Sequence, residues 1–315
     1  IKGTYREIHR IKEAQQVHLA QASCYAYFYA KQQELSAIRI RITYCNMETE
    51  ELKYFHYEYT IRELENWFME IINSYRRWAD FQYEWQGLKQ QSIKQLVFPF
   101  PYREGQKNLV TYVYQTIYHR KKLFIEAPTG VGKTISTVFP SIKAMGEGKG
   151  QRIFYLTAKT ITRTVANDTL ELLRKQMLRL KSVTLTAKDK ICFIEETECN
   201  PVDCPYAKGH FDRINDAIYD LLIHEDNFSR EKIEEYAARH KVCPFEMSLD
   251  MSLFADMIIC DYNYLFDPHV YLKRFFSEGV REDYIFLIDE AHNLVDRARD
   301  MFSAQISKRS FMEFH

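Results

Sequence analysis

The chain has 315 residues, of which 46% are hydrophobic and 15% aromatic, which is enough for two domains with buried cores. Lys plus Arg and Asp plus Glu both total 43, so the formal net charge is zero. A globally basic nucleic-acid binder is therefore excluded, and any such contact must come from local patches. No apolar run approaches the roughly 18–20 residues of a membrane helix, and the start, IKGTYREIHR, lacks the apolar core of a signal peptide. We predict a soluble, cytoplasmic chain without a membrane partner. Because it begins at Ile1 rather than Met, we also expect a segment of a longer protein.

Residues 1–97 are predicted to form a small α+β domain. HLAQASCYAYFYAKQQ (18–33) suits a helix, and IRIRITYCN (38–46) alternates as a half-buried strand does. LKYFHYEYT (52–60) reads as a second strand, with the polar METEE as the hairpin connection between the two. The following IRELENWFMEIINSYRRWADFQYEWQ predicts a long amphipathic helix.

The pattern changes at the segment SIKQLVFPFPYREGQ, so the second domain is expected to cover residues 98–315. Short apolar strands then alternate with helical stretches, which favours a parallel α/β sheet. A Cys-rich and charged stretch from about 188 to 250 interrupts this rhythm and is interpreted as an insertion. The predicted strands are LFIEA (123–127), RIFYLTA (152–158), MIICD (257–261) and YIFLID (284–289).

The motif APTGVGKT follows the first of these strands and precedes a helix-forming stretch, ISTVFPSIKAM. It has the pattern of a phosphate-binding loop, in which glycines let backbone N–H groups face phosphate oxygens. Lys133 would neutralise the β- and γ-phosphates of ATP, and the hydroxyl of Thr134 would bind Mg²⁺. A chance match in a glycine-containing loop is the alternative, and the flanking strand and helix argue against it. The predicted nucleotide-binding residues of this loop are Ala127, Thr129, Gly130, Val131, Gly132, Lys133 and Thr134.

A second motif, DEAH, ends the apolar strand YIFLID. A strand end beside a phosphate loop is where the acid that binds Mg²⁺ is expected. Asp289 would hold the metal, Glu290 would deprotonate the attacking water, and His292 would link the nucleotide to a moving partner domain. A solvated turn at a strand end is the alternative interpretation.

Four of the seven cysteines lie between these two motifs, in the order Cys192-x6-Cys199-x4-Cys204-x38-Cys243. In a cytosolic chain such a group favours a metal site over disulfides. Spacing alone does not choose iron over zinc, although the paired C-x2-C knuckles of structural zinc are missing. Four unrelated thiols are the third interpretation.

The AxTGxGKT and DEAH motifs together resemble those of the superfamily-two helicases. FPFPYREGQ (98–106) resembles the adenine-recognition motif of their XPD/DinG branch, in which Gln106 would bind the adenine edge and Phe100 or Tyr102 would pack on the base. Without the resemblance, this segment would read as a hydrophobic staple at a helix start. YLTAKTITRT (155–164) resembles a loop that contacts the DNA backbone, and ADMIICDYNYLFDP (255–268) resembles the strand before the acidic motif. A polar helix cap and a packing motif are the respective alternatives.

This resemblance implies a RecA-like P-loop NTPase domain with an inserted domain that holds a [4Fe–4S] cluster through Cys192, Cys199, Cys204 and Cys243. CPY (204–206) and CPFEMSLDMS (243–252) are similar to that family's cysteine contexts. It also implies an ATP- and Mg²⁺-dependent DNA helicase of 5′-to-3′ direction that acts on single strands and duplex junctions. A second RecA-like domain, not in this sequence, would complete the ATP site. A nucleotide-gated DNA-binding module and a zinc-bearing translocase, both without unwinding, are the alternatives.

The N-terminal IKG and QASCY resemble the end of a PD-(D/E)xK nuclease of the RecB type. The resemblance implies that Lys2 is the lysine of that active site, with Gln21 and Tyr25 on the following helix. The metal-binding carboxylates that precede the lysine in that family are not in this sequence, so we expect no nuclease activity from it. An incidental match of two short strings is the alternative.

Overall fold

The computed structural model describes residues 1–315 except 129, 159, 195–197, 278, 280–281 and 305–315. It divides into two compact units, Ile1–Tyr83 and Glu84–His315. The division falls inside one long helix, whereas the sequence placed a boundary at residue 97. No helix in the described part of the chain is both long and apolar enough to cross a membrane.

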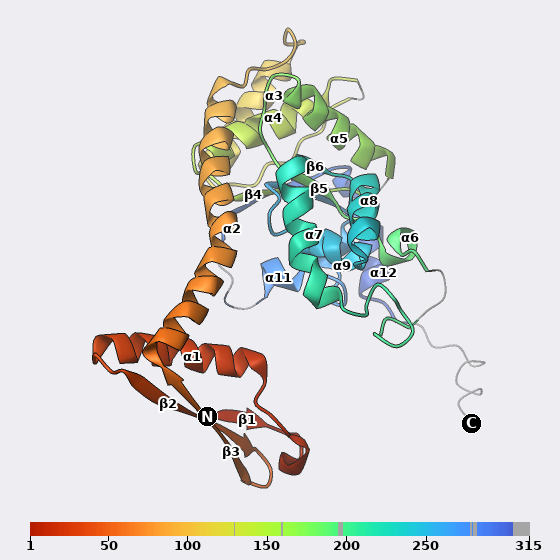
Figure 1. The fold of residues 1–315 in the computed structure, drawn as a ribbon. Coiled ribbons are helices and arrows are strands. Elements are labelled where there is room, and N and C mark those ends of the chain that lie inside the picture. Colours follow the sequence, from red (N-terminus) through yellow and green to blue (C-terminus); the bar gives the residue numbers. More distant parts are fainter. Residues whose placement is uncertain (129, 159, 195–197, 278, 280–281, 305–315) are drawn as a thin grey trace, which may run out of the picture. The chain divides into compact units, whose positions relative to one another are not determined.

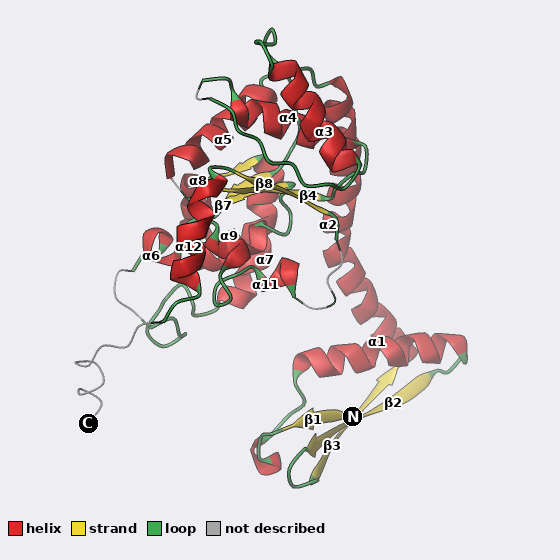
Figure 2. Ribbon diagram, turned by 180° about the vertical axis from the view of Figure 1, so that it is seen from behind, coloured by secondary structure: helices red, strands yellow, loops and turns green. Residues whose placement is uncertain are grey.

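The first unit is a three-stranded sheet covered by one helix (Figures 1 and 2). Its strand order is β1-β2-β3, with β1 parallel and β3 antiparallel to β2. Alternation in β2 and β3 sends one set of side chains, including Ile40, Ile42 and Tyr44, into a core shared with α1 and the start of α2. The predicted helix, hairpin and long helix are confirmed. The elements are β1 (Lys2–Thr4), η1 (Ile8–Arg10), α1 (Gln16–Gln32), β2 (Ala37–Asn46), β3 (Leu52–Thr60) and α2 (Ile61–Gln95).

The second unit is built on a five-stranded parallel sheet of order β6-β5-β7-β4-β8. Its strands are short, and β4, β7 and β8 are mostly apolar. β7 is buried along its whole length, as the inner strands of a sheet covered on both faces are. The strands predicted near 152, 257 and 284 are confirmed. The bounds are β4 (Arg152–Leu156), β5 (Ser182–Thr184), β6 (Asn227–Phe228), β7 (Met257–Cys260) and β8 (Tyr284–Ile288).

Helices cover both faces of this sheet, with α3, α4 and α5 on one side and α7, α9 and α11 on the other (Figures 1 and 2). The predicted insertion supplies α6 to α9 and also the edge strand β6. The helices are α3 (Gln106–Tyr118), α4 (Lys133–Gly146), α5 (Thr160–Arg174), α6 (Lys188–Ile191), α7 (His210–His224), α8 (Arg230–His240), α9 (Pro244–Met251), α10 (Asn263–Phe266), α11 (Lys273–Phe276), η2 (Ala291–Asn293) and α12 (Leu294–Met301).

The prediction of a strand at residues 123–127 is wrong, because the structure has no strand there. The segment from 121 to 128 has no regular secondary structure, and the side chains of Leu123, Phe124 and Ile125 are 40%, 89% and 41% exposed. A strand exists through its ladder hydrogen bonds, and this segment pairs with no described strand. β8 therefore forms the edge of the sheet on the side of the phosphate loop.

Candidate nucleotide site

The phosphate loop turns directly into α4. Gly130 (φ 84°) and Gly132 (φ 73°) both have left-handed backbone conformations that residues with a Cβ atom seldom adopt. Gly132 is also the residue before the helix, and a Cβ atom on it would lie 2.8 Å from Nε2 of Gln106. The first N–H groups of α4 have no partners within the helix and form a positive end suited to phosphate. Thr129 lies outside the described residues, and Ala127 belongs to the segment without regular structure.

The candidate adenine-binding residue, Gln106, lies against this loop. It begins α3 and is only 5% exposed. Its Oε1 accepts a hydrogen bond from the backbone N–H of Arg103 (3.0 Å), and its Nε2 donates to the carbonyl oxygen of Val131 (3.0 Å). The guanidinium of Arg103 donates to the carbonyl oxygen of Gly130. The amide group of Gln106 thus ties the aromatic-proline segment to the phosphate loop.

The aromatic side chains of this segment are placed differently from one another. Phe98 and Tyr102 stack with ring centroids 4.3 Å apart, and Phe98 also meets the edge of Phe139 in α4. Phe100 is 53% exposed and Tyr102 is 41% exposed. Tyr102 is therefore held against the core with one part open, whereas Phe100 faces solvent.

The two side chains expected to bind Mg²⁺ are joined by a tyrosine that the sequence did not single out. The hydroxyl of Tyr155, in β4, interacts with the side chains of both Thr134 and Asp289. Burial, and then the neighbouring charge of Asp289, raise the pKa of Tyr155 well above its usual value. β4 and β8 are parallel and in register, and the N–H of Asp289 donates to the carbonyl oxygen of Leu156 (2.9 Å), which continues the ladder. The pairing of β4 with β8 therefore places Asp289 close to the start of α4.

Lys133 and Glu290 form an ion pair across the same site, with 3.6 Å between Nζ and Oε1. The other carboxylate oxygen of Glu290 lies 3.5 Å from Nδ1 of His292, which is 73% exposed. The structure therefore brings together Lys133, Thr134, Asp289, Glu290 and His292, which the sequence assigned separately to two motifs.

Three of the four predicted cluster cysteines surround one lysine. The positive charge of Lys188 is favoured by a hydrogen bond to Cys199 and by the proximity of Cys192 and Cys243, all of which raise its pKa. Burial raises the pKa of the Cys243 thiol, while backbone N–H groups at the start of α9 act in the opposite direction.

All four predicted cluster cysteines are free of disulfides, and Cys204 is 7% exposed. Within the described residues, no group of three or more His, Cys, Asp or Glu side chains is arranged to hold a metal ion. The donor types suit an iron–sulfur cluster, but the structure does not show a preformed one.

In the first unit, the three residues tied to the nuclease resemblance lie on neighbouring elements. Lys2 Nζ in β1 donates to Oε1 of Gln21 in α1 at 2.6 Å. Tyr25, one turn further along the helix, is 67% exposed. The side chains of the lysine and the glutamine are therefore hydrogen-bonded to each other.

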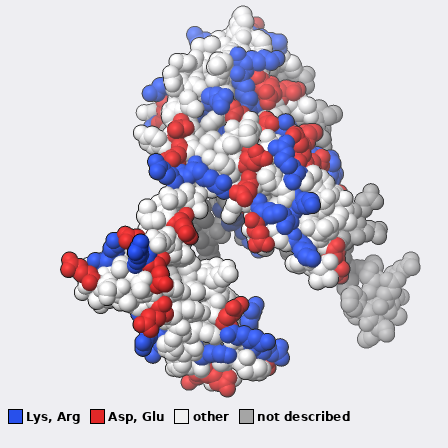
Figure 3. All heavy atoms as spheres, viewed as in Figure 1, with Lys and Arg blue, Asp and Glu red and all other residues white. Residues whose placement is uncertain are grey.

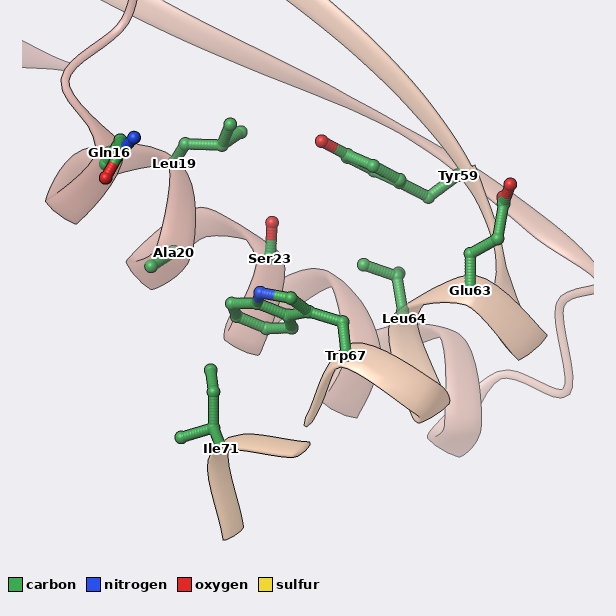
Figure 4. Close-up of a pocket in the computed structure, with 9 residues that line it drawn as sticks. All are labelled: Gln16, Leu19, Ala20, Ser23, Tyr59, Glu63, Leu64, Trp67 and Ile71. Atoms are coloured by element: carbon green, nitrogen blue, oxygen red, sulfur yellow. The ribbon is translucent and has the colours of Figure 1, made fainter. Parts of the chain in front are cut away.

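A pocket of about 550 Å³ in this unit lies between α1, β3 and the start of α2, where Trp67, Leu64 and Ile71 face Leu19 and Ala20 (Figure 4). Its acid, Glu63, accepts hydrogen bonds from the backbone N–H and the hydroxyl of Thr60 (both 2.8 Å), which is a capping box at the start of α2. These bonds already engage one of its carboxylate oxygens, so the pocket receives no functional assignment. The face of the molecule in Figure 3 has Lys and Arg interspersed with Asp and Glu, in keeping with zero net charge.

Comparisons with known proteins match parts of this chain to helicases. Residues 105–200 match the DEAD/DEAH box helicase model, and residues 164–311 match the DEAD_2 model. The helicase subunit XPD of general transcription and DNA repair factor IIH from Dictyostelium discoideum is 31% identical over 88 residues, which is 28% of this chain and 11% of that protein. A probable ATP-dependent helicase of Methanocaldococcus jannaschii is 28% identical over 207 residues, or 64% of this chain and 30% of that protein.

The ATP-dependent DNA helicase XPD of Sulfolobus acidocaldarius is 24% identical over 209 residues, covering 65% of this chain and 35% of that protein. A solved XPD helicase structure aligns with 63% of this chain and 34% of its own, at 22% identity and a TM-score of 0.46. This chain thus spans about a third or less of the length of these three curated relatives.

Proposed function

We propose that residues 105–311, of which 105–200 match the DEAD/DEAH box helicase model and 164–311 match the DEAD_2 model, belong to the XPD-like branch of the superfamily-two helicases and form the ATP-binding part of an ATP-dependent DNA helicase. The observation that carries the proposal is the meeting of Lys133 with Glu290, 3.6 Å apart, beside the start of α4. A nucleotide-binding module without hydrolysis has no need of a second carboxylate at this point.

The triphosphate would bind over the N-terminal end of α4, where backbone N–H groups and Lys133 offset its charge. Lys133 would exchange Glu290 for the β- and γ-phosphates, and the freed carboxylate would then accept a proton from the attacking water. Thr134 and Asp289 would hold Mg²⁺, which neutralises charge that develops on the phosphates. Gln106 would present its amide to the adenine edge.

The four insertion cysteines, Cys192, Cys199, Cys204 and Cys243, would hold a [4Fe–4S] cluster, which cross-links the loops of the insertion. Lys188, which lies among three of these thiols, supports this assignment because a cation offsets the negative charge of thiolate ligands.

The function is tested by ATP hydrolysis in the full-length protein, with and without single-stranded DNA. Glu290→Gln should lower the DNA-stimulated kcat by about 100-fold or more, as loss of a catalytic base or charge stabiliser does. Glu282→Gln is the matched control: it makes the same change just before β8, where Glu282 pairs with Arg152 at 3.4 Å. Equal rates for the two variants, or no hydrolysis by the wild type, would refute the proposal. Duplexes with a single 5′ or 3′ tail then test unwinding and the proposed 5′-to-3′ direction.

The cluster is tested by purification without oxygen, followed by assays for iron, sulfide and zinc. We expect about four iron and four sulfide per chain, and loss of both in Cys204→Ser. Cys24→Ser, in the first unit, is the control and should keep them. A colourless protein that contains zinc would instead favour the translocase alternative.

The first unit is proposed to be the remnant of a PD-(D/E)xK nuclease, supported by the 2.6 Å hydrogen bond between Lys2 and Gln21. In the full-length protein, any metal-dependent cleavage of DNA should be lost in Lys2→Ala and kept in Lys12→Ala, which alters an exposed lysine of the same unit. Cleavage that persists in Lys2→Ala would contradict this assignment.

A further inference from the structure

The side chain of Tyr262 contacts the backbone of the turn that carries Asp289 and Glu290, the two carboxylates of the proposed reaction. It follows β7 and is fully buried. Its hydroxyl donates to the carbonyl oxygen of Asp289 and lies 3.1 Å from that of Glu290. A phenol that reaches two consecutive carbonyl oxygens fixes the backbone from which both side chains project.

This turn requires external support. Glu290 has φ 52° and ψ 47°, a left-handed conformation that costs a residue with a Cβ atom roughly 1–2 kcal/mol. Such a conformation persists only where surrounding contacts hold it. The backbone N–H and the side-chain amide of Asn293 also donate to the carbonyl oxygen of Glu290, at 3.0 and 3.1 Å. The hydroxyl of Tyr262 adds a contact from a different element, the central region of the sheet.

The residue before Tyr262, Asp261, joins two arginines from different helices. Nη2 of Arg297, in α12, donates to both of its carboxylate oxygens at 3.0 and 3.2 Å. Nη2 of Arg163, in α5, donates to Oδ2 at 3.3 Å. The side chain of Asp261 is 15% exposed, so these ion pairs are shielded from solvent.

The two helices joined at Asp261 belong to the two regions that the reaction must couple, the acidic turn and the segment expected to bind nucleic acid. α12 begins just after the DEAH turn, and Arg163 belongs to the segment 155–164 that is expected to contact the nucleic-acid backbone. The buried Nε atoms of Arg163 and Arg297 find no hydrogen-bond partner among the described residues.

We propose that Tyr262 and Asp261 are positioning residues that couple the strand-binding segment to ATP hydrolysis. Tyr262 holds the turn that aims Asp289 and Glu290. Asp261 holds Arg163 and Arg297, so a shift of α5 when a strand binds is passed to the turn through the Asp261–Tyr262 backbone. The proposal rests on the proposed helicase function and adds the means of its regulation by nucleic acid.

The test measures ATP hydrolysis by the full-length protein over a range of ATP and single-stranded DNA concentrations. Tyr262→Phe removes one hydroxyl and should lower kcat about tenfold while leaving the KM for ATP within about twofold, because misplacing a catalytic group slows chemistry without weakening binding. Asp261→Asn should lower the ratio of DNA-stimulated to basal rate at least about threefold, with the Kd for the strand little changed.

Tyr264→Phe is the matched control, since the same change two residues later removes a long contact of 3.4 Å to the carbonyl oxygen of Thr186. An unchanged kcat in Tyr262→Phe, an equal loss in Tyr264→Phe, or an unchanged stimulation ratio in Asp261→Asn would overturn the proposal. A wild-type protein without strand-stimulated hydrolysis would instead refute the proposed function, so the two failures are distinguishable.

Discussion

The side chain of Lys181 is predicted to anchor the Cys-bearing insertion to the sheet. It is 1% exposed, and its Nζ donates to the carbonyl oxygens of Leu222 (2.7 Å) and Glu225 (2.6 Å) and to Oδ1 of Asp226 (2.9 Å). The same nitrogen lies 4.1 Å from the centre of the Trp85 ring. Lys181 thus places a cation at the C-terminal end of α7, where the helix dipole favours one.

Lys181→Met keeps an unbranched side chain that is shorter by one heavy atom, and it removes the charge. Loss of one partner from a buried ion pair costs about 3–5 kcal/mol, and Asp226 keeps a second cation, Arg179, at 3.5 Å. The lower end, about 3 kcal/mol, is therefore expected. For a unit of this size, about 2–4 °C of Tm corresponds to each kcal/mol, so Tm should fall by about 6–12 °C.

Thermal unfolding followed by circular dichroism measures this shift, and hydrogen exchange should place the earliest loss of protection at the end of α7. Lys175→Met, at an exposed position near the end of α5, is the control and should change Tm little. A fall of less than about 2 °C in Lys181→Met would show that the three hydrogen bonds contribute no net stability, and the reasoning would be wrong.

Three further predictions concern the nucleotide loop and the first unit. Gln106→Ala should raise the Kd for Mg·ATP about tenfold more than the Kd for Mg·GTP if the amide recognises adenine, because loss of its bond to the phosphate loop affects both nucleotides alike; calorimetric titration with both nucleotides checks this. Gly132→Ala should abolish ATP binding in the same assay, because φ is 73° and the new Cβ atom would lie 2.8 Å from Gln106 Nε2. Burial, and then the charge of Lys2, lower the pKa of His18 below 6.5, and its Nδ1 lies 2.8 Å from the hydroxyl of Tyr44. The neutral imidazole is therefore the stabilising form, so its contribution is complete above pH 6.5 and is lost as the pH falls through the lowered pKa. Unfolding midpoints of the first unit across this range should drop toward acid, and His18→Phe should flatten the drop.

Local patterns determined which elements the sequence could predict. β3 was predicted at its observed bounds because LKYFHYEYT is rich in the aromatic residues that strands favour and follows the polar METEE. LFIEA has the same apolar character, yet residues 123–127 form no strand, because ladder pairing depends on a partner that the local sequence does not specify. Periodicity thus indicates the tendency of a segment, and tertiary pairing decides the outcome.

In the candidate site, too, residues within local motifs could be predicted and contacts between distant residues could not. Lys133, Asp289 and Glu290 could be predicted as site residues because each belongs to a compact motif with a physical requirement for that residue type. Neither Tyr155 nor Tyr262 was predicted to support the acidic motif, although both contact the acidic turn. The hydroxyl of Tyr155 reaches Thr134 and Asp289, and the hydroxyl of Tyr262 reaches residues 27 and 28 positions further along the chain. A single tyrosine in or just after an apolar strand carries no local sign of such a distant partner.

The ion pair between Lys133 and Glu290 leads to a last prediction about binding. Mg·ATP must separate these side chains, which are 36% and 34% exposed, so the pair contributes about 0.5–1 kcal/mol against nucleotide binding. Glu290→Gln removes this competition and should lower the Kd for Mg·ATP about two- to fivefold, even though it blocks hydrolysis. Titration at low and high salt checks the cause, because the gain should shrink as salt screens the wild-type pair. Glu282→Gln should leave the Kd unchanged at both salt concentrations. If Glu290→Gln binds no more tightly than the wild type, the carboxylate does not compete with phosphate for Lys133, and the exchange of partners that begins the proposed reaction is wrong.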